Sequence, residues 1–279
     1  MELPKFVPRP KFEEYREQFK DYFYMERRNG IILVRMHTNG GPVVWTHQQH
    51  NAMGQVWHVI GNDPENEVMI LTSTGQYWIA KGDQAIDEAT QQEVMKGDPT
   101  KPIYEFYTYD STKLVSNLIN DVDIPTIAAI NGPGIHTEMG LLCDITLCSE
   151  DTLFNDMHFL MGWVPGDGQY LAFQKLLGDK RATYYIYTGK TIDAKSALEW
   201  GMVSEVLPRE KLLDRAWEIA ESIMKQPRVN RRVTCQLVRR PWKRLLTDDF
   251  DLHIANEFFS LAVTKPKHDF DKITKPLQK

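Results

Sequence analysis

The sequence predicts an α/β fold, in which strands and helices alternate up to about Gly168 and helices follow alone. Apolar runs typical of strands cover residues 30–37 and 67–72, and an amphipathic helix is expected between them over residues 48–61. A further helix is expected before Ile124, where it leads into a strand over residues 126–130. Alternating strands and helices are typical of sheets covered by helices, so the pattern favours the α/β class.

The pattern after Gly168 becomes helical. Asp193 is placed to cap the start of a short helix, and Gly201 to end it. Longer helices are expected over residues 170–177, 181–188, 209–225 and 248–263, with one more bracketed by Pro227 and Pro241. The helix over residues 209–225 carries its apolar residues on one side, which predicts that it packs against another surface.

The change of pattern predicts a division near Pro208. We expect an α/β core of residues 1–207 and a C-terminal helical region of residues 208–279. An amphipathic helical segment gains most of its stability from packing, so this region is expected to contact a neighbouring subunit.

Composition limits the class of protein without naming it. The chain has 279 residues, of which 42% are hydrophobic and 25% charged, as expected of a globular protein with a substantial core. A formal net charge of −5 argues against a nucleic-acid partner. No apolar run approaches the ~20 residues of a membrane span, and the start of the chain lacks a signal-peptide hydrophobic region, so we expect a cytoplasmic protein with no membrane partner.

The chain has three cysteines, Cys143, Cys148 and Cys235. A small, odd number of cysteines is expected of reduced thiols rather than of disulfides.

Two histidines and two acids stand at the corners of an apolar stretch, residues 124–168. His136 and Glu138 follow the turn of residues 131–134, which ends the strand-like run, so both side chains are expected on a loop at the carboxyl edge of that strand. His158 and Asp167 flank a second corner, residues 164–168.

A histidine paired with a carboxylate is the usual means of activating water near neutral pH, because the acid fixes the imidazole tautomer and stabilises the imidazolium. His158 and Asp167 could form such a pair if the Pro-Gly corner folds the chain back. Without other information, His158 is more often a buried histidine whose hydrogen bonds are satisfied in the core, and Asp167 an ordinary turn residue.

Several segments in order resemble the crotonase (enoyl-CoA hydratase/isomerase) superfamily. They are IPTIAAINGP, LLCDI, GWVPGDG and GDKRATYYIYTGKTIDAKSALEWGMVSEVLP, and the resemblance covers most of residues 28–262. Within the superfamily the chain is most similar to the β-diketone hydrolases, whose type is 6-oxocamphor hydrolase. The resemblance implies a ββα spiral core followed by a C-terminal helical oligomerisation region, and a homotrimer or dimer of trimers.

Departures from the hydratase pattern favour the diketone hydrolase branch. Glu138 stands six residues before Asp144, as the first hydratase glutamate does, but His158 stands where hydratases carry the second. Asp167 occupies a corner position where hydratases tend to have a small residue. The resemblance therefore implies that a histidine and an aspartate replace a pair of glutamates.

The resemblance also assigns substrate contacts. His136 would replace a backbone donor of the oxyanion hole, Gly82 would supply the other donor, and Glu138 would line the same pocket. Trp45 matches a tryptophan that donates its indole N–H to a carbonyl, and Glu257 matches a glutamate that reaches the site from the C-terminal helices. Without the family, Trp45 is better explained by core packing and Glu257 by a solvated helix face.

The implied function is a β-diketone hydrolase that cleaves the bond between two carbonyls by retro-Claisen attack of an activated water. His158, oriented by Asp167, would be the base, His136 and Trp45 would stabilise the oxyanion, and His158 or Glu257 would return a proton to carbon. The implied partner is a small-molecule β-diketone, with no cofactor and no metal.

Two alternatives remain at this point. One is an acyl-CoA hydratase, isomerase or hydrolase, for which tail cations could face nucleotide phosphates. The candidate cations are Arg228, Arg231, Arg232, Arg239, Arg240, Lys243 and Arg244, although such a run is most often a solvated helix face. The other alternative is a non-catalytic subunit with the crotonase fold.

Overall fold

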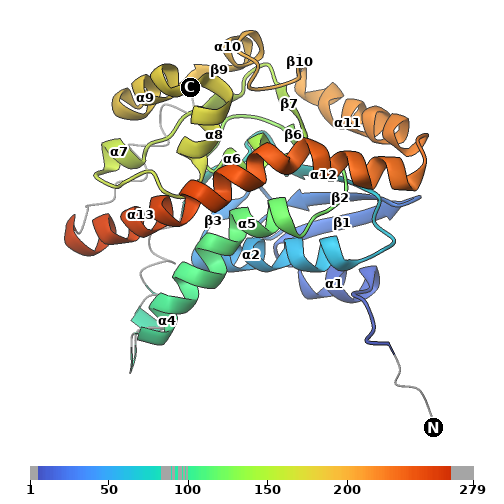
Figure 1. Ribbon diagram of the computed structural model, residues 1–279, viewed down its shortest axis with the longest axis horizontal. Coiled ribbons are helices and arrows are strands. Elements are labelled where there is room, and N and C mark those ends of the chain that lie inside the picture. Colours follow the sequence, from blue (N-terminus) through green and yellow to red (C-terminus); the bar gives the residue numbers. More distant parts are fainter. Residues whose placement is uncertain are drawn as a thin grey trace.

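A six-stranded mixed sheet forms the centre of the computed structural model, which describes residues 6–82, 89, 92–93, 96, 98 and 100–264 (Figure 1). The strand order is β1-β2-β4-β6-β7-β10, in which β1 is antiparallel to β2 and all other pairs are parallel. The strands are β1 (Phe23–Arg28), β2 (Ile31–Met36), β4 (Val68–Ser73), β6 (Thr126–Ile130), β7 (Ile145–Ser149) and β10 (Glu205–Leu207). The predicted α/β class is confirmed, and the strands predicted near residues 30–37, 67–72 and 126–130 are β2, β4 and β6.

Both faces of the sheet are covered, so its central strands are apolar throughout. In β4, Met69 and Leu71 belong to the cluster beneath α2 (His47–Asn62) and α5 (Lys113–Asn120), whereas Val68 and Ile70 belong to the cluster beneath α11 (Arg209–Met224). Successive side chains of a strand point to opposite faces, which explains this alternation. The apolar side of α11 predicted from the sequence therefore packs on the sheet of its own chain.

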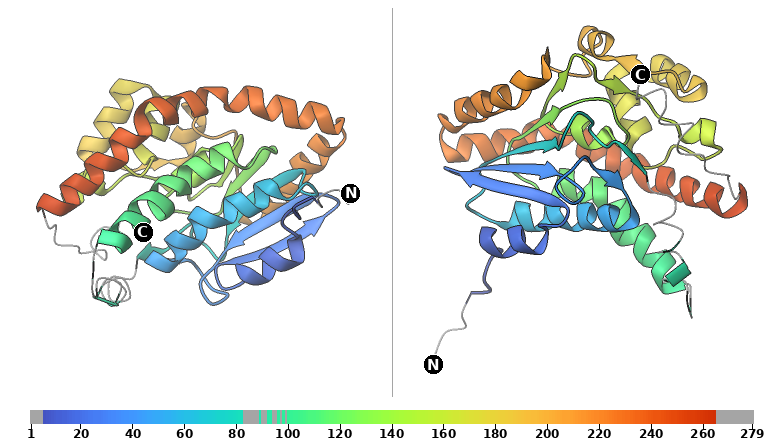
Figure 2. Two further views of the ribbon diagram at one scale, coloured as in Figure 1. Left: turned by 60° about the horizontal axis from the view of Figure 1, so that its bottom comes forward. Right: turned by 180° about the vertical axis from the view of Figure 1, so that it is seen from behind.

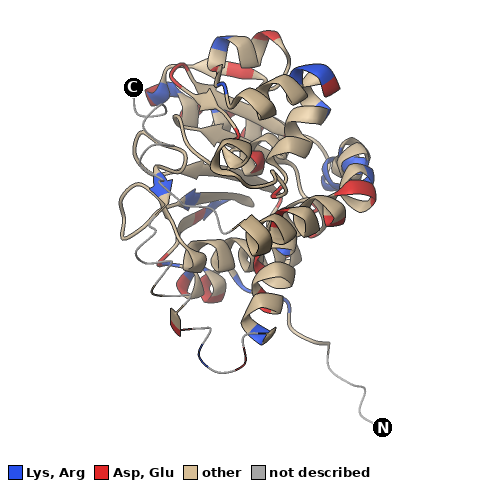
Figure 3. Cartoon of the chain, turned by 90° about the vertical axis from the view of Figure 1, so that its left-hand side faces the viewer, with Lys and Arg blue, Asp and Glu red and all other residues tan. Residues whose placement is uncertain are grey.

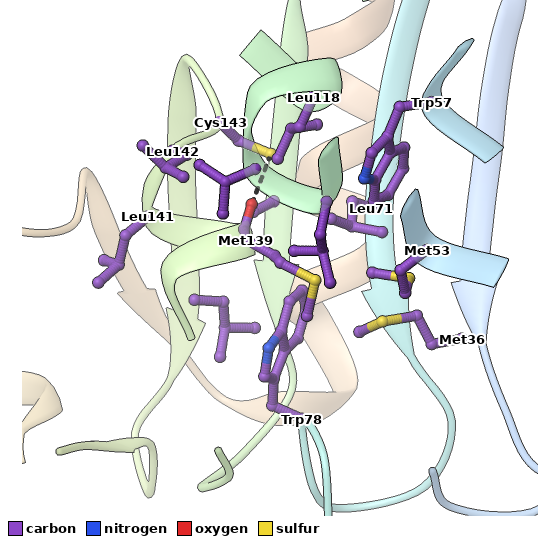
Figure 4. Close-up of a cluster of buried hydrophobic side chains, with 14 of the residues drawn as sticks. Met36, Met53, Trp57, Leu71, Trp78, Leu118, Met139, Leu141, Leu142 and Cys143 are labelled. Carbon is purple, nitrogen blue, oxygen red and sulfur yellow. Dashed lines mark hydrogen bonds between the residues drawn. The ribbon is translucent and has the colours of Figure 1, made fainter. Parts of the chain in front are cut away.

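The larger core cluster lies between the sheet and the helices that follow it. Figure 4 shows Trp57 of α2, Trp78 and Met139 among its members, with the thiol of Cys143 donating to the carbonyl of Met139. Trp57 and Trp78 are completely buried. All three cysteines are buried and free, and burial raises the pKa of each thiol to about 12.

Two small sheets position the segments beside the main sheet. β3 (Val44–Trp45) pairs in parallel with β5 (Lys81–Gly82), and β8 (Leu153–Phe154) pairs antiparallel with β9 (Ile192–Asp193). The first pair fixes the backbone of Trp45, and β8 leads directly into the segment that carries His158. Neither pair is anticipated from the sequence, because two-residue strands carry no periodic signal.

The remaining helices surround this core. They are α1 (Phe12–Gln18), α4 (Thr100–Glu105), the π-helical turn η1 (Phe106–Thr112), α6 (Glu138–Leu141), α7 (His158–Met161), α8 (Gln169–Leu177), α9 (Asp179–Thr188) and α10 (Ala194–Glu199). Asp193 caps α10 as predicted, since its carboxylate accepts from the backbone N–H of Ser196 at 2.7 Å.

The last two helices form one long arm. α12 (Arg228–Leu245), the π-helical turn η2 (Leu246–Phe250) and α13 (Asp251–Thr264) follow one another, and Figures 1 and 2 show this arm beside α5 and η1. The predicted helix end at Pro241 is wrong, because α12 continues through it. Proline removes the hydrogen bond to the carbonyl of Leu237, but Leu237 is 67% exposed, so water can hydrate that carbonyl.

Buried arginines fasten α12 to the core. Arg239 donates to both carboxylate oxygens of Asp144, at 2.8 and 2.6 Å, and also to the carbonyls of Val122 and Ile124. Arg231 pairs with Glu67 at 2.5 Å. The predicted division near Pro208 stays a prediction, and residues 265–279 of its second part lie outside the described residues.

Figure 3 shows acidic and basic segments interspersed over the visible face rather than gathered by sign. None of the described helices combines the length and the apolar composition that a membrane-spanning helix requires.

Candidate active site

A cavity of about 240 Å³ opens where the loops after β6 and β8 meet the C-terminal arm. Six of the seven residues that the sequence singled out line it: Trp45, His136, Glu138, His158, Asp167 and Glu257. Its apolar wall comes largely from Phe106, Leu114, Ile135, Met157, Met161, Ile254, Phe258 and Leu261. The cavity therefore has a titratable end and an apolar end, as small-molecule sites commonly do.

Gly82 is the exception. It is buried in β5 and pairs with Trp45 across the small sheet, but it is absent from the described residues that line the cavity. Gly82 thus supports the backbone of Trp45 by pairing with it across the small sheet.

His136 stands on the loop between β6 and α6 with a left-handed backbone, φ 53°. This conformation is uncommon for a residue with a Cβ and is often found at functional sites. The indole N–H of Trp78 donates to the carbonyl of His136 at 2.9 Å, and the chain at Gly134 packs so closely on Ile79 that a Cβ there would lie 2.5 Å from the Ile79 nitrogen. These contacts hold the loop in place.

Two acids face the His136 ring. Nδ1 lies 2.9 Å from Oε1 of Glu138 and 3.3 Å from Oδ2 of Asp167. Burial lowers the pKa of His136, but the charges of Glu138 and Asp167 outweigh burial and raise this pKa above its usual value. Burial raises the pKa of Glu138, whose side chain is completely inaccessible. The 2.9 Å contact therefore joins an imidazole and a carboxyl group that are both largely enclosed, and one proton can bridge them.

His158 begins α7 and contacts a different acid through each ring nitrogen. Nδ1 lies 2.8 Å from Oδ1 of Asp156, which also accepts from the backbone N–H of His158 at 2.9 Å. Nε2 lies 3.6 Å from Oδ2 of Asp167 and 3.9 Å from Oε1 of Glu257. Burial lowers the pKa of His158, but Asp167 and Asp156 outweigh this effect and raise the pKa well above its usual value.

Asp167 lies between the two histidines. A single oxygen, Oδ2, approaches both His136 and His158, while Oδ1 accepts from the backbone N–H of Gln169 at 3.1 Å. Burial tends to raise the pKa of Asp167, but the two imidazoles more than offset it, so this pKa is lowered. Asp167 is therefore an anion at neutral pH.

The expected proximity of His158 and Asp167 is present, but the expected geometry needs correction. The sequence interpretation placed Asp167 behind the imidazole as its orienting anion. In the structure Asp156 occupies that place, at Nδ1, and Asp167 faces Nε2 on the cavity side. The corner of residues 164–168 turns Asp167 across the site because the Gln169 backbone holds it there.

Glu257 reaches the cavity from α13, as expected from the resemblance. Its side chain is 11% exposed, and burial raises its pKa to about 8. Gly166 makes this approach possible, because a Cβ at that position would lie 2.6 Å from the Cβ of Glu257.

Sequence reasoning missed three titratable residues of the described cavity lining, Asp156, His47 and His50. A signal for Asp156 was available, since an aspartate two residues before His158 can accept from its backbone N–H. His50 lies in α2 with its ring centroid 5.1 Å from that of Trp45, and burial lowers its pKa to about 3. The sequence gives no sign that this face of α2 meets the cavity.

Within the part of the chain that the structure describes, two sets of side chains have ligand atoms close enough to hold a metal ion. They are His136, Glu138 and Asp167, and Asp156, His158 and Asp167, with all ligand atoms in a set within 4.8 Å of one another. The same atoms also make the hydrogen bonds and ion pairs described above. Among the described residues that line the cavity, none is a lysine or arginine.

Comparisons with known proteins agree with this architecture. The family model for enoyl-CoA hydratase/isomerase matches residues 26–265. The structure of ABDH, a beta-diketone hydrolase from the cyanobacterium Anabaena sp. PCC 7120 bound to (S)-3-oxocyclohexyl acetic acid, is similar with a TM-score of 0.81 and 36% identity, covering 90% of this chain and 98% of that one. An enoyl-CoA hydratase/isomerase from Mycobacterium paratuberculosis shares the fold with a TM-score of 0.77 at 21% identity, covering 92% and 98% of the two chains.

Carnitinyl-CoA dehydratase of Citrobacter koseri is 31% identical over 174 residues, which span 62% of this chain and 63% of that protein. The match thus spans less than two thirds of the length of this curated relative. The family match covers most of the chain, and the fold and the neighbouring structures agree with it. The chain belongs to the enoyl-CoA hydratase/isomerase family, the crotonase superfamily.

Proposed function

We propose that this protein is a β-diketone hydrolase, which uses water to cleave a carbon–carbon bond between two carbonyls and releases a keto acid. The observation that carries the proposal is the placement of two histidines, His136 and His158, on either side of the ionised Asp167 in one small cavity. Similarity to a beta-diketone hydrolase over most of the chain supports it.

In this proposal His158 is the general base. Its Nε2 is the ring nitrogen that faces Asp167 and Glu257 at the cavity. A water held between Nε2 and a substrate carbonyl would lose a proton to Nε2 and form a C–O bond to the carbonyl carbon. The resulting tetrahedral oxyanion then re-forms its C=O bond, and the bond to the α-carbon breaks.

His136 and Trp45 are proposed to stabilise the developing oxygen charges. The two acids raise the pKa of His136 and so favour its protonated form, in which Nδ1 would donate to Glu138 and the Nε2 proton would be available to a substrate oxygen. A charged donor is stronger than a neutral one, and a donor aimed at a developing oxyanion is among the largest contributions to catalysis. The Trp45 ring also provides apolar surface for the substrate's carbon skeleton.

The electron pair released by C–C cleavage is delocalised onto the second carbonyl as an enolate. Its α-carbon must then gain a proton, which can come from the imidazolium of His158 or from Glu257. A pKa of about 8 keeps Glu257 protonated at neutral pH, so it can act as the acid. Because the second carbonyl accepts the charge, the proposed reaction needs no metal and no organic cofactor.

The residues that line the cavity favour a neutral substrate over one that carries nucleotide phosphates. The described lining residues include several acids and aromatic rings but no lysine or arginine. Four of the seven tail cations that could have faced phosphates are engaged with acids of the same chain: Arg228, Arg231 and Arg232 with Glu67, and Arg239 with Asp144.

An acyl-CoA hydratase, isomerase or hydrolase is the second candidate. The resemblance to carnitinyl-CoA dehydratase favours it, and so does Glu138 at the position of the first hydratase glutamate. However, Oε1 of Glu138 is occupied by His136, and the residue at the second glutamate position is a histidine.

The test is to supply cyclic and linear β-diketones and follow the loss of enol absorbance, with His158→Ala as the matched variant. We expect turnover by the wild type and loss of turnover in the variant. Turnover of acyl-CoA thioesters, with every diketone left intact, would establish the second candidate instead. Inactivity towards both classes would favour a non-catalytic subunit.

We further propose that the protein forms a homotrimer or a dimer of trimers. Val229, Val233 and Leu237 are exposed at four-residue intervals on α12, which gives this helix an apolar outer stripe suited to a second copy of the chain. Sedimentation velocity measures the assembly directly, and a monomer at micromolar concentration would contradict the proposal.

A further inference from the structure

Asp156 and Asp167 contact opposite sides of the same imidazole. Asp156 Oδ1 lies 2.8 Å from Nδ1 of His158, within hydrogen-bond range, whereas Asp167 Oδ2 lies 3.6 Å from Nε2, beyond it. A ring that donates through Nδ1 to a carboxylate is, when neutral, unprotonated on Nε2. The two acids therefore cannot serve the same purpose.

The place of Asp156 is determined by more than its contact with the ring. Its side chain is 1% exposed, and the oxygen that meets Nδ1 also accepts from the backbone N–H of His158. Asp156 is consequently fixed to the backbone of the residue that it orients. Asp167 is fixed instead to the start of α8, through Gln169, and belongs to a different loop.

We propose that Asp156 is the positioning residue of the catalytic histidine: it holds His158 as the Nδ1–H tautomer and aims the lone pair of Nε2 into the cavity. Asp167 is then released from the orienting role and lies on the substrate side, where its Oδ2 faces both His136 and His158. This inference rests on the proposed function for its catalytic meaning, but the tautomer itself is a property of the protein without substrate.

The charged groups around His158 come from four segments. Asp156 precedes α7, Asp167 precedes α8, Glu257 belongs to α13, and His136 lies across Asp167 on the loop before α6. Asp167 and Glu257 approach Nε2, and of these four groups Asp156 is the one that contacts Nδ1. Removing the Asp156 charge should therefore lower the pKa of His158 while leaving the Nε2 side intact.

The first experiment is nitrogen NMR of protein labelled with ¹⁵N-histidine, recorded without substrate above the pKa of His158, with His158→Gln to assign the signal. We expect the neutral ring to carry its proton on Nδ1 in the wild type and in Asp167→Asn, and a mixture of tautomers in Asp156→Ala. Neutral His158 protonated on Nε2 in the wild type would overturn the proposal. Apart from the assignment of the signal, this result comes from the wild-type protein alone.

The second experiment is the pH dependence of diketone hydrolysis by Asp156→Asn. The amide oxygen can accept both hydrogen bonds but carries no charge, so the variant isolates the effect of the anion. We expect kcat to fall by about 10²-fold with little change in KM. The acid limb of the profile should move to lower pH by about one unit or more, the size typical of one adjacent charge.

Asp214→Asn, at an exposed position of α11, is the matched control and should leave both quantities unchanged. An acid limb and kcat equal to those of the wild type in Asp156→Asn would overturn the proposal. A loss confined to thermal stability would show that Asp156 is only structural.

The two experiments separate this inference from the proposed function. If no diketone is hydrolysed but neutral His158 carries its proton on Nδ1, the proposed function fails while the assignment of Asp156 as the tautomer-fixing acid stands. If diketones are hydrolysed and the proton is on Nε2, the proposed function stands and Asp156 loses its role.

Discussion

The indole of Trp45 lies against the imidazole of His136, with ring centroids 4.2 Å apart and an interplanar angle of 30°. An aromatic face attracts a cation, so this contact favours the protonated imidazole that the neighbouring acids also favour. Trp45 is itself held by pairing of β3 with β5. The small sheet, which no sequence pattern predicts, therefore helps to position the proposed oxyanion donor.

Replacement of His136 by alanine should cost about 3 kcal/mol of transition-state stabilisation, the scale for loss of one oxyanion donor. The loss should appear in kcat/KM for diketone hydrolysis under steady-state conditions. Trp45→Phe keeps an aromatic face but removes the indole N–H, and we expect a smaller loss from it. An unchanged kcat in His136→Ala would remove His136 from the mechanism.

Asp167→Asn should reduce turnover by about 10²-fold or more while leaving binding largely intact. The reason is that Oδ2 of Asp167 faces both imidazoles, so the variant removes the anion on the cavity side of the base and beside the oxyanion donor. Separate measurement of kcat and KM tests this. If only KM rose, Asp167 would be a binding residue.

The pH profile should have two limbs. A base must be neutral to accept a proton, and the pKa of His158 is raised well above its usual value, so activity should fall as pH decreases through that raised pKa. An acid must be protonated to donate, and the pKa of Glu257 is about 8, so activity should fall as pH rises above about 8. Glu257→Gln cannot ionise, and we expect the alkaline limb to disappear in it. Persistence of that limb in the variant would assign the ionisation to another group.

Arg239→Met should destabilise the fold by about 3–5 kcal/mol, because it leaves the carboxylate of Asp144 buried without its cation. Equilibrium unfolding in urea measures this change. Arg240→Ala, at the adjacent exposed position, should change stability by about 0.5 kcal/mol or less. Equal effects of the two variants would contradict a structural role for the buried arginine.

Gly166→Ala should impair activity by displacing Glu257. An added Cβ would lie 2.6 Å from the Glu257 Cβ and would also meet the carbonyl of His253, so α13 must shift away from the corner. We expect kcat to fall and the alkaline limb of the pH profile to move. Gly178→Ala is a control for a glycine with open space around it, although its positive φ will lower stability somewhat. Wild-type kinetics in Gly166→Ala would show that the contact is not needed.

Local sequence patterns were sufficient to predict the main strands and helices. The apolar strands β2, β4 and β6 and the cap of α10 follow from period, composition and capping chemistry, which depend on neighbours in sequence. The helix end predicted at Pro241 is wrong because the rule that proline ends a helix ignores tertiary contacts. Arg231 and Arg239 fasten the part of α12 before Pro241, and Leu246 and Phe250 beyond it are buried in the core.

The candidate site likewise depends partly on local sequence and partly on tertiary structure. From the residues alone came a histidine and an acid at each of two loop corners, and the resemblance added Trp45 and Glu257. Which oxygen meets which nitrogen was beyond the sequence, because Asp156 and Asp167 are the same residue type and lie on either side of His158 along the chain. Only the tertiary structure decided between them: a hydrogen bond needs a defined distance and direction, and these arise where β8, the corner of residues 164–168 and α13 converge from distant parts of the chain.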